Sequence, residues 1–142
     1  MIREATRADI PQMARMARDF HAASPMNRYS FSPMRAAQAA MAAIDNPGTL
    51  ALVLDLNGLH GALLASVRAY PLGDTLCAYE DVLWVDPDYR GRWGVKLIRR
   101  FEDWASDMGA AVIGISCPVG TVERLYASLG FTQAETTFAK GL

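Results

Sequence analysis

The stretch Val85-Asp86-Pro87-Asp88-Tyr89-Arg90-Gly91-Arg92-Trp93-Gly94 decides how this sequence folds. It follows an apolar run, Leu76 to Val85, that predicts a strand, and it precedes a run from Val95 to Met108 whose apolar residues recur at helical spacing. The segment Arg90 to Gly94 is therefore expected to be a loop that leads into a helix N-terminus. Unpaired backbone N–H groups and a partial positive charge make such a terminus a natural anion site.

The composition of this loop supports an anion site. Gly91 and Gly94 let the backbone approach a ligand closely, and Arg90, Arg92 and Lys96 add full positive charges. A tight turn followed by a solvated basic helix face is the alternative interpretation. No Gly-Lys-Ser/Thr follows, so the loop is not a Walker A motif, and it lacks the three glycines of a dinucleotide-binding fingerprint.

Strands and helices extend outward from this stretch in both directions. Asn57-Gly58 is a strong hairpin signal between two apolar runs, which predicts an antiparallel strand pair. The predicted order is strand, helix, helix, three strands, helix, strand, helix, strand, with residues 21–31 irregular. The predicted elements are strands over Met1 to Ala5, Thr49 to Leu56, Leu59 to Tyr70, Leu76 to Val85, Val112 to Ser116 (buried) and Phe131 to Lys140, and helices over Ile10 to Phe20, Met34 to Ile44, Val95 to Met108 and Thr121 to Leu129.

Length and composition indicate one globular domain spanning residues 1–142. A chain of 142 residues can form a core without disulfides, and 51% hydrophobic residues with 20% charged residues are too apolar for disorder. No apolar run reaches the roughly 20 residues of a membrane helix, and the N-terminus lacks the apolar stretch of a signal peptide. We therefore expect a cytoplasmic protein that does not bind membranes.

The net charge and the scattered cysteines and histidines argue against two further classes of protein, general nucleic-acid binders and metal-binding proteins. The formal net charge is −1, which argues against a general nucleic-acid binder, although five of the 14 basic residues fall between Arg90 and Arg100. This small basic surface suits a compact polyanion. Cys77 and Cys117 form no C-x-x-C pair and the two histidines are scattered, so we expect no metal site.

The quoted stretch resembles the pyrophosphate-binding motif of the GNAT family, the GCN5-related N-acetyltransferases. Members carry Q/R-x-x-G-x-G/A after the fourth strand, and the loop here is one residue shorter if Gly94 is taken as the last glycine. A second family phrase, L-Y-x-x-L-G-F, stands here from Leu125 to Phe131. Two motifs in the right order extend the resemblance over the whole chain. It implies a mixed α/β fold with a central, mostly antiparallel sheet flanked by about four helices, of the small stand-alone type known from bacteria and phages.

The resemblance implies acetyl-coenzyme A as cosubstrate and an amine as acceptor. It places the pantetheine along the strand end Leu83, Trp84 and Val85, and the pyrophosphate on the backbone of Arg90, Gly91, Arg92, Trp93, Gly94 and Val95. A backbone N–H near Leu83 or Trp84 would polarise the acetyl carbonyl. No metal takes part.

Two residues are the catalytic candidates. The resemblance implies that Glu80 is the base, directly or through water, and that Tyr126 is the acid that protonates the leaving thiolate. Strand alternation places Glu80 and Asp81 on opposite faces, so only one of them faces the cleft. Structural or solvated carboxylates, and a tyrosine that only packs under the sheet, are the alternatives.

Direct acetyl transfer to a primary amine is the expected reaction, on a small-molecule or peptide acceptor. His21 and Tyr29 lie in the irregular segment that borders the acceptor site in this family. The main alternative is a coenzyme A-binding or regulatory module of the same fold that has lost catalysis. The sequence names neither the acceptor nor the oligomeric state, and a homodimer is compatible with it.

Overall fold

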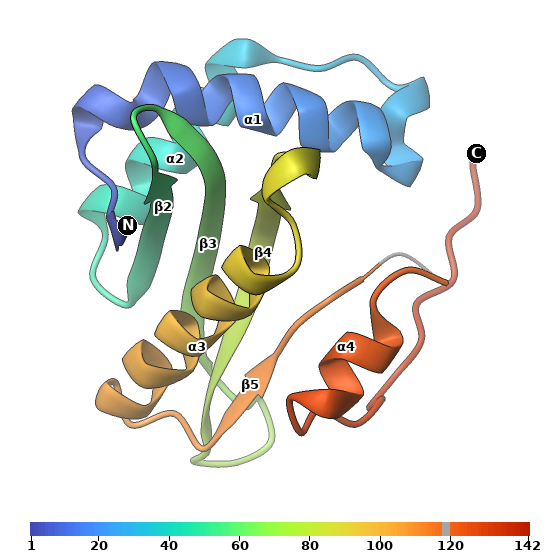
Figure 1. Cartoon of the computed structure of the whole chain (residues 1–142). Helices are drawn as coiled ribbons and strands as arrows, with labels where there is room; N and C mark the ends of the chain where they lie inside the picture. Colours follow the sequence, from blue (N-terminus) through green and yellow to red (C-terminus); the bar gives the residue numbers. More distant parts are fainter. Residues whose placement is uncertain (118–119) are drawn as a thin grey trace.

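The chain forms a five-stranded sheet with helices on both faces, in a computed structural model that describes residues 1–117 and 120–142 (Figure 1). The strands lie in the order β1-β2-β3-β4-β5, antiparallel except for the parallel pair β4 and β5. This confirms the predicted mixed, mostly antiparallel sheet and the four helices. The strands are β1 (Ile2–Glu4), β2 (Thr49–Asp55), β3 (Leu59–Ala69), β4 (Leu76–Val85) and β5 (Val112–Gly114); the helices are α1 (Ile10–Ala23), α2 (Pro33–Asp45), α3 (Arg92–Asp107) and α4 (Glu123–Ser128), with 3₁₀ turns η1 (Arg7–Asp9), η2 (Pro25–Arg28) and η3 (Pro87–Tyr89).

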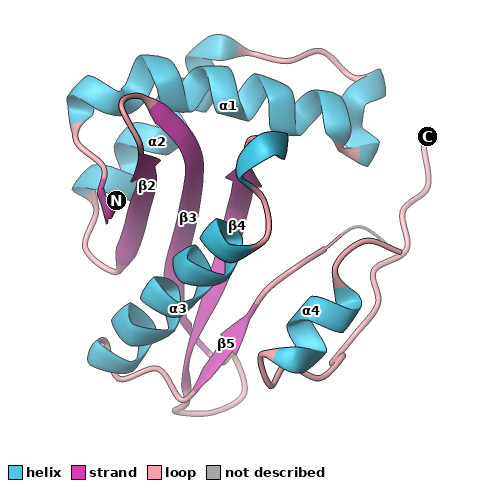
Figure 2. Ribbon diagram, in the orientation of Figure 1, coloured by secondary structure: helices cyan, strands magenta, loops and turns pink. Residues whose placement is uncertain are grey.

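Helices cover both faces of the sheet, which explains why β2 is apolar almost throughout (Figure 2). Leu50 and Leu52 of β2 pack in the same cluster as Leu97 and Phe101 of α3. The alternate β2 residues, Ala51 and Val53, pack in a second cluster with residues of α1 and α2 such as Met13 and Ala40. The strand β4 therefore runs between two hydrophobic layers, and its C-terminal end leads directly into α3.

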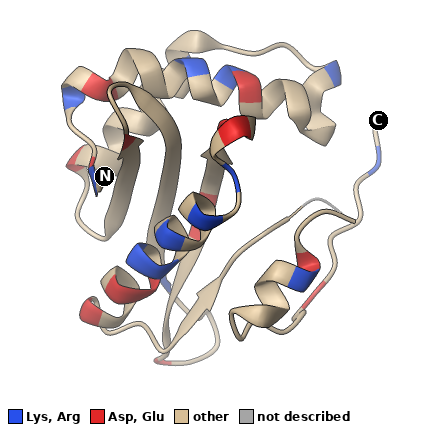
Figure 3. Ribbon diagram, viewed as in Figure 1, with Lys and Arg blue, Asp and Glu red and all other residues tan. Residues whose placement is uncertain are grey.

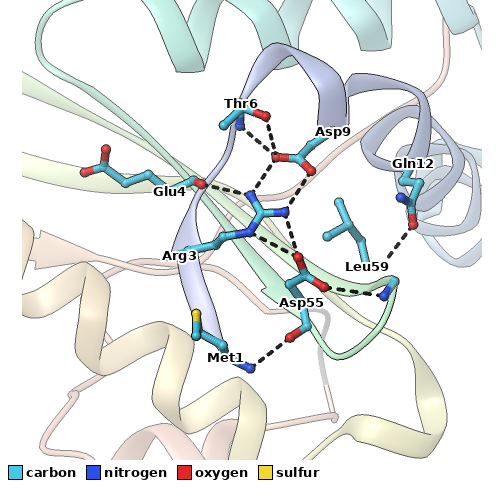
Figure 4. Close-up of polar contacts among 9 residues, drawn as sticks. Met1, Arg3, Glu4, Thr6, Asp9, Gln12, Asp55 and Leu59 are labelled. Carbon is cyan, nitrogen blue, oxygen red and sulfur yellow. Dashed lines mark hydrogen bonds and ion pairs between the residues drawn. The ribbon is translucent and has the colours of Figure 1, made fainter.

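The N-terminal strand is fixed by an ion-pair network that joins it to α1 and to the β2–β3 hairpin (Figure 4). The guanidinium of Arg3 donates to Asp9 at 2.8 Å and to Asp55 at 2.8 Å. Asp9 also accepts hydrogen bonds from the backbone N–H and hydroxyl of Thr6. Its side chain is buried, and the hydrogen bonds from Arg3 lower the pKa of Asp9 to about 2.

Several predicted boundaries need correction. α3 begins at Arg92 rather than Val95, because Gly91 adopts φ 85° and takes the N-cap position. Residues 21–31 contain the last turn of α1 and η2, and α4 is shorter than the predicted 121–129. β5 ends at Gly114, and Val112 is exposed rather than buried because β5 pairs only with β4 in the described part of the chain.

The predicted C-terminal strand, 131–140, is wrong. The described residues 131–142 contain no helix or strand, and Phe138 lies almost fully exposed. Thr and Phe favour strands, but this preference depends on a neighbouring strand and a core to pack against, and residues 131–142 pair with no strand in the described part of the chain.

Candidate active site

The strands β4 and β5 are paired only at their beginnings. The parallel ladder runs from Cys77–Val112 to Tyr79–Gly114, and β4 then continues for six residues with no strand beside it on this edge in the described part of the chain. The Tyr79 ring lies directly on Gly114, where a Cβ would be 2.5 Å from Tyr79 Cδ1. This pair therefore marks the point at which the two strands part (Figure 1).

Glu80 is the first residue of β4 beyond that point. Its Oε2 accepts a hydrogen bond of 3.1 Å from the backbone N–H of Ser116, which lies two residues past the end of β5. Burial raises the pKa of Glu80 to about 7, assisted by the charge of Asp81 and opposed by the Ser116 hydrogen bond. A carboxyl group with this pKa can accept a proton near neutral pH.

Asp81 points to the opposite face, as the alternation predicted. It accepts hydrogen bonds from Ser66 Oγ at 3.0 Å and from Arg68 Nη2 at 2.8 Å. A register shift between β3 and β4, where Leu64 pairs with Val82 and Ala65 with Glu80, leaves Asp81 without a paired residue on β3. The two carboxylates are thus separated by the sheet and held by different partners.

Tyr126 lies on the same side as Glu80. Its hydroxyl donates to the backbone carbonyl of Ser116 at 3.1 Å, so Glu80 and Tyr126 contact the backbone N–H and the backbone carbonyl of the same residue. Burial, followed by the charges of Glu80 and Cys117, raises the pKa of Tyr126, which keeps the hydroxyl protonated at neutral pH. The sequence carried no signal for Ser116, because its backbone rather than its side chain makes both contacts.

The start of α3 provides open backbone N–H groups. The N–H of Val95 donates to the carbonyl of Gly91 at 3.1 Å, so the hydrogen bonding of α3 begins there, and the preceding N–H groups, of residues 92–94, have no backbone acceptor within the helix among the described residues. A Cβ placed on Gly91 or Gly94 would meet no described atom within 4 Å. This terminus fits a diphosphate, because space, N–H donors and the helix dipole coincide there.

Lys and Arg residues follow one another along α3 (Figure 3), and those around its N-terminus make different contacts. Arg90 Nε donates to the carbonyl of Val85 at 2.9 Å, and its guanidinium lies 5.0 Å from the Trp84 ring, so the exposed Arg90 side chain ties the loop to the end of β4. Arg92 and Lys96 instead lie 5.0 and 4.5 Å from the ring of Trp93. They remain exposed in the first turns of α3, where they can meet an anion.

The strand residues predicted to contact the cosubstrate have mostly inward-facing side chains. Leu83 and Val85 pack in the cluster beneath α3, and Trp84 packs in the cluster beneath α1 and α2. Any contact with a ligand at this edge of β4 therefore falls to the strand's backbone.

The remaining candidates give no second site. His21 Nε2 lies 2.9 Å from the carbonyl of Tyr29, which joins the end of α1 to the loop after η2. Among the described residues no three histidine, cysteine or acidic side chains cluster as metal ligands, and no helix is long and apolar enough to cross a membrane.

Comparisons with known proteins show the family and the fold of the chain. The model of the acetyltransferase (GNAT) family matches residues 13–131. The fold is similar to a transcriptional regulator from Bacillus halodurans C-125 (TM-score 0.81, 20% identity) and to an aminoglycoside antibiotic 6′-N-acetyltransferase from Acinetobacter haemolyticus (TM-score 0.73, 22% identity). It is also similar to a ribosomal-protein-alanine N-acetyltransferase from Brucella melitensis biovar Abortus 2308 (TM-score 0.73, 16% identity). Each alignment covers 100% of this chain and 99% of the other. No curated protein sequence matches the chain.

Proposed function

Because the chain belongs to the acetyltransferase (GNAT) family, we propose that it transfers the acetyl group of acetyl-coenzyme A to a primary amine by direct attack. The observation that carries the proposal is the meeting of Glu80 and Tyr126 at Ser116, where β4 and β5 part. Acetyl-coenzyme A would supply an acetyl group activated as a thioester. The chain's own residues would bind it, orient it and move two protons.

Backbone groups of the loop before α3 and of β4 would bind acetyl-coenzyme A. The N–H groups of residues 92–94 would hold the pyrophosphate, while Gly91 and Gly94 leave room for it. The unpaired edge of β4 beyond Tyr79 would receive the pantetheine. A backbone N–H near Leu83 or Trp84 on that edge would polarise the acetyl carbonyl.

Glu80 would act as the general base. An alkylamine has a pKa near 10.4 and is mostly protonated at neutral pH, so a proton must leave before or during attack. Glu80, with a pKa of about 7, is partly ionised at that pH and can accept this proton directly or through one water molecule. The hydrogen bond from Ser116 fixes the carboxylate on the side where the strands part.

Tyr126 would act as the general acid toward the leaving thiolate. Its raised pKa keeps it protonated, and a thiolate needs a proton once the carbon–sulfur bond breaks. In this structure the hydroxyl donates to the Ser116 carbonyl at 3.1 Å, so the proton transfer requires the hydroxyl to exchange that acceptor for sulfur.

The acceptor class is a small molecule or a peptide. Two of the acetyltransferases that share this fold are described by their acceptors, an aminoglycoside antibiotic in one case and a ribosomal-protein alanine in the other, so the fold accommodates both kinds. We propose an amine from one of these two classes for this chain.

A coenzyme A-binding module without catalysis is the second candidate. It is favoured by one observation, the engagement of the Tyr126 hydroxyl with Ser116. Thiol release from acetyl-coenzyme A in the presence of a panel of small amines, polyamines and peptides separates the two. Amine-dependent release supports the enzyme, whereas tight binding of coenzyme A with no release above the amine-free rate supports the module.

A further inference from the structure

Asp86 stands where β4 ends and the loop toward α3 begins, and its half-buried carboxylate has three side-chain partners. Oδ1 accepts from Trp84 Nε1 at 2.9 Å, and Oδ2 contacts His60 Nδ1 at 3.1 Å. Arg15 of α1 approaches both oxygens at 3.5 Å. The aromatic and basic residues around Asp86 therefore come from α1, β3 and β4.

The charge on Asp86 matches these partners. Burial alone would raise the pKa of Asp86, but hydrogen bonds from Trp84, His60 and Arg15 lower it. The carboxylate is therefore ionised at neutral pH and acts only as an acceptor. Asparagine at this position would put an NH₂ group in place of one of those oxygens, opposite Trp84 or Arg15, whose side chains only donate.

The same residue controls the turn that follows. The backbone carbonyl of Asp86 accepts from the N–H of Tyr89 at 2.9 Å, which closes η3, and its own N–H donates to the carbonyl of His60 at 2.8 Å. The Tyr89 ring stacks on His60, with centroids 4.1 Å apart and planes 17° from parallel. Gly91, the N-cap of α3, follows two residues later.

Two α1 side chains, one of them the Asp86 partner Arg15, also hydrogen-bond to the start of β3. Arg15 Nη2 donates to the carbonyl of Leu59 at 2.9 Å, and Gln12 Oε1 accepts from the N–H of Leu59 at 2.9 Å (Figure 4). The β3 residue that stacks on the loop, His60, is next to Leu59 in the chain. The turn 87–89 is thus held against α1 and β3.

We propose that Asp86 is a positioning residue for the pyrophosphate of coenzyme A. It touches no part of the open N–H cluster at residues 92–94; it fixes the turn that determines where that cluster lies. This inference rests on the proposed function, because it assumes that the cluster binds the pyrophosphate.

The test compares a ligand that carries phosphates with one that does not. Asp86→Asn should raise the Kd for coenzyme A by roughly tenfold, because a loop that adopts the binding geometry for a smaller fraction of the time loses affinity in that proportion. The Kd for pantetheine, the phosphate-free part of the ligand, should stay within about twofold because it does not reach the loop. Calorimetry measures the first constant, and an NMR titration measures the weaker second one.

Asp55→Asn is the matched control. Asp55 accepts from Arg3 and from the Gly58 N–H, so its loss removes an ion-pair network that makes no hydrogen bond or ion pair with Asp86 or the described residues 87–94; the Kd values for both ligands should stay within about twofold of the wild-type values. If Asp86→Asn fails to fold, His60→Phe keeps a ring against Tyr89, deletes the bond to Asp86, and should weaken coenzyme A selectively by a smaller factor.

Two results would overturn the positioning role: unchanged affinity for coenzyme A in the variant, or equal weakening of coenzyme A and pantetheine, which would mean general damage to the fold. A wild-type protein that binds neither ligand would instead refute the proposed function itself.

Discussion

Replacing Gly114 with alanine should disturb the point at which the two strands that define the site part. A Cβ at this position would lie 2.5 Å from Tyr79 Cδ1 and 2.7 Å from Cε1, whereas carbon atoms in contact prefer roughly 3.5–4.0 Å. The ring or β5 must therefore retreat by about 1 Å. Gly114 pairs with Tyr79 at the last position before the strands part, so the shift reaches Glu80 and Ser116 directly.

The expected loss in the free energy of unfolding lies at the low end of the range for substitutions that overpack a core. Tyr79 is 38% exposed and has the Arg68 guanidinium 4.7 Å from its ring, so the ring can move toward solvent by giving up contacts with Gly114 and Arg68. We expect a loss of about 1–2 kcal/mol in the free energy of unfolding and a Tm lower by roughly 3–8 °C. The Kd for coenzyme A should rise at the same time.

A double-mutant cycle with Tyr79→Ala tests the cause. Once the ring is gone, Gly114→Ala should cost less than about 0.5 kcal/mol in urea denaturation, because the clash no longer exists. Gly94→Ala is the control glycine, since its Cβ would meet no described atom within 4 Å, and it should leave stability unchanged or slightly higher. Additive effects of the two changes, or a wild-type Tm for Gly114→Ala, would refute the argument that this contact sets the parting of the strands.

Three further predictions concern the loop, the acid and the N-terminal network. Gly94→Val should keep the fold, because its side chain has room, yet raise the Kd for coenzyme A at least about tenfold in calorimetry; unchanged affinity would place the phosphate site elsewhere. In a thiol-release assay, Tyr126→Phe should lower kcat by roughly 10- to 100-fold and leave the KM for acetyl-coenzyme A nearly unchanged. If the chemical step limits the rate, a wild-type kcat in this variant would argue against Tyr126 as the acid. Asp9→Asn should cost about 2 kcal/mol at pH 7 in urea denaturation; because the folded pKa is depressed, this difference should shrink as the pH falls toward 2, and a pH-independent difference would contradict the charge-based explanation.

The sequence predicted those parts of the fold that local pattern determines. Asn57-Gly58 predicted the β2–β3 hairpin, and both residues adopt the positive φ that such a turn requires. The alternation around Glu80 predicted that it and Asp81 face opposite sides, which holds despite the register shift beside them. Glycines, proline and apolar spacing located α1, α2 and α3 to within a few residues.

The parts of the fold and of the site that depend on tertiary contacts could not be predicted from local sequence patterns. The site forms around the backbone of Ser116, and no side-chain pattern marks a backbone group. Asp86 contacts Trp84 two positions away, but its other partners, His60 of β3 and Arg15 of α1, lie 26 and 71 positions away in sequence, so no local motif contains the network. The side chain of Arg90, a charge expected to favour an anion, donates to the Val85 carbonyl, a backbone acceptor that no residue pattern marks.

The role of Glu80 as the base is tested most directly by the pH dependence of kcat/KM for the wild-type protein, Glu80→Gln and Asp81→Asn. The account predicts that the wild-type value falls as the pH drops below about 7, the pKa of the buried carboxyl. Glu80→Gln should lose this acidic limb together with about 10²-fold of its activity near neutral pH, while Asp81→Asn keeps the wild-type profile. A Glu80→Gln variant that keeps both the limb and the rate would contradict the account, and loss of the limb in Asp81→Asn instead would assign the base to the other face of the sheet.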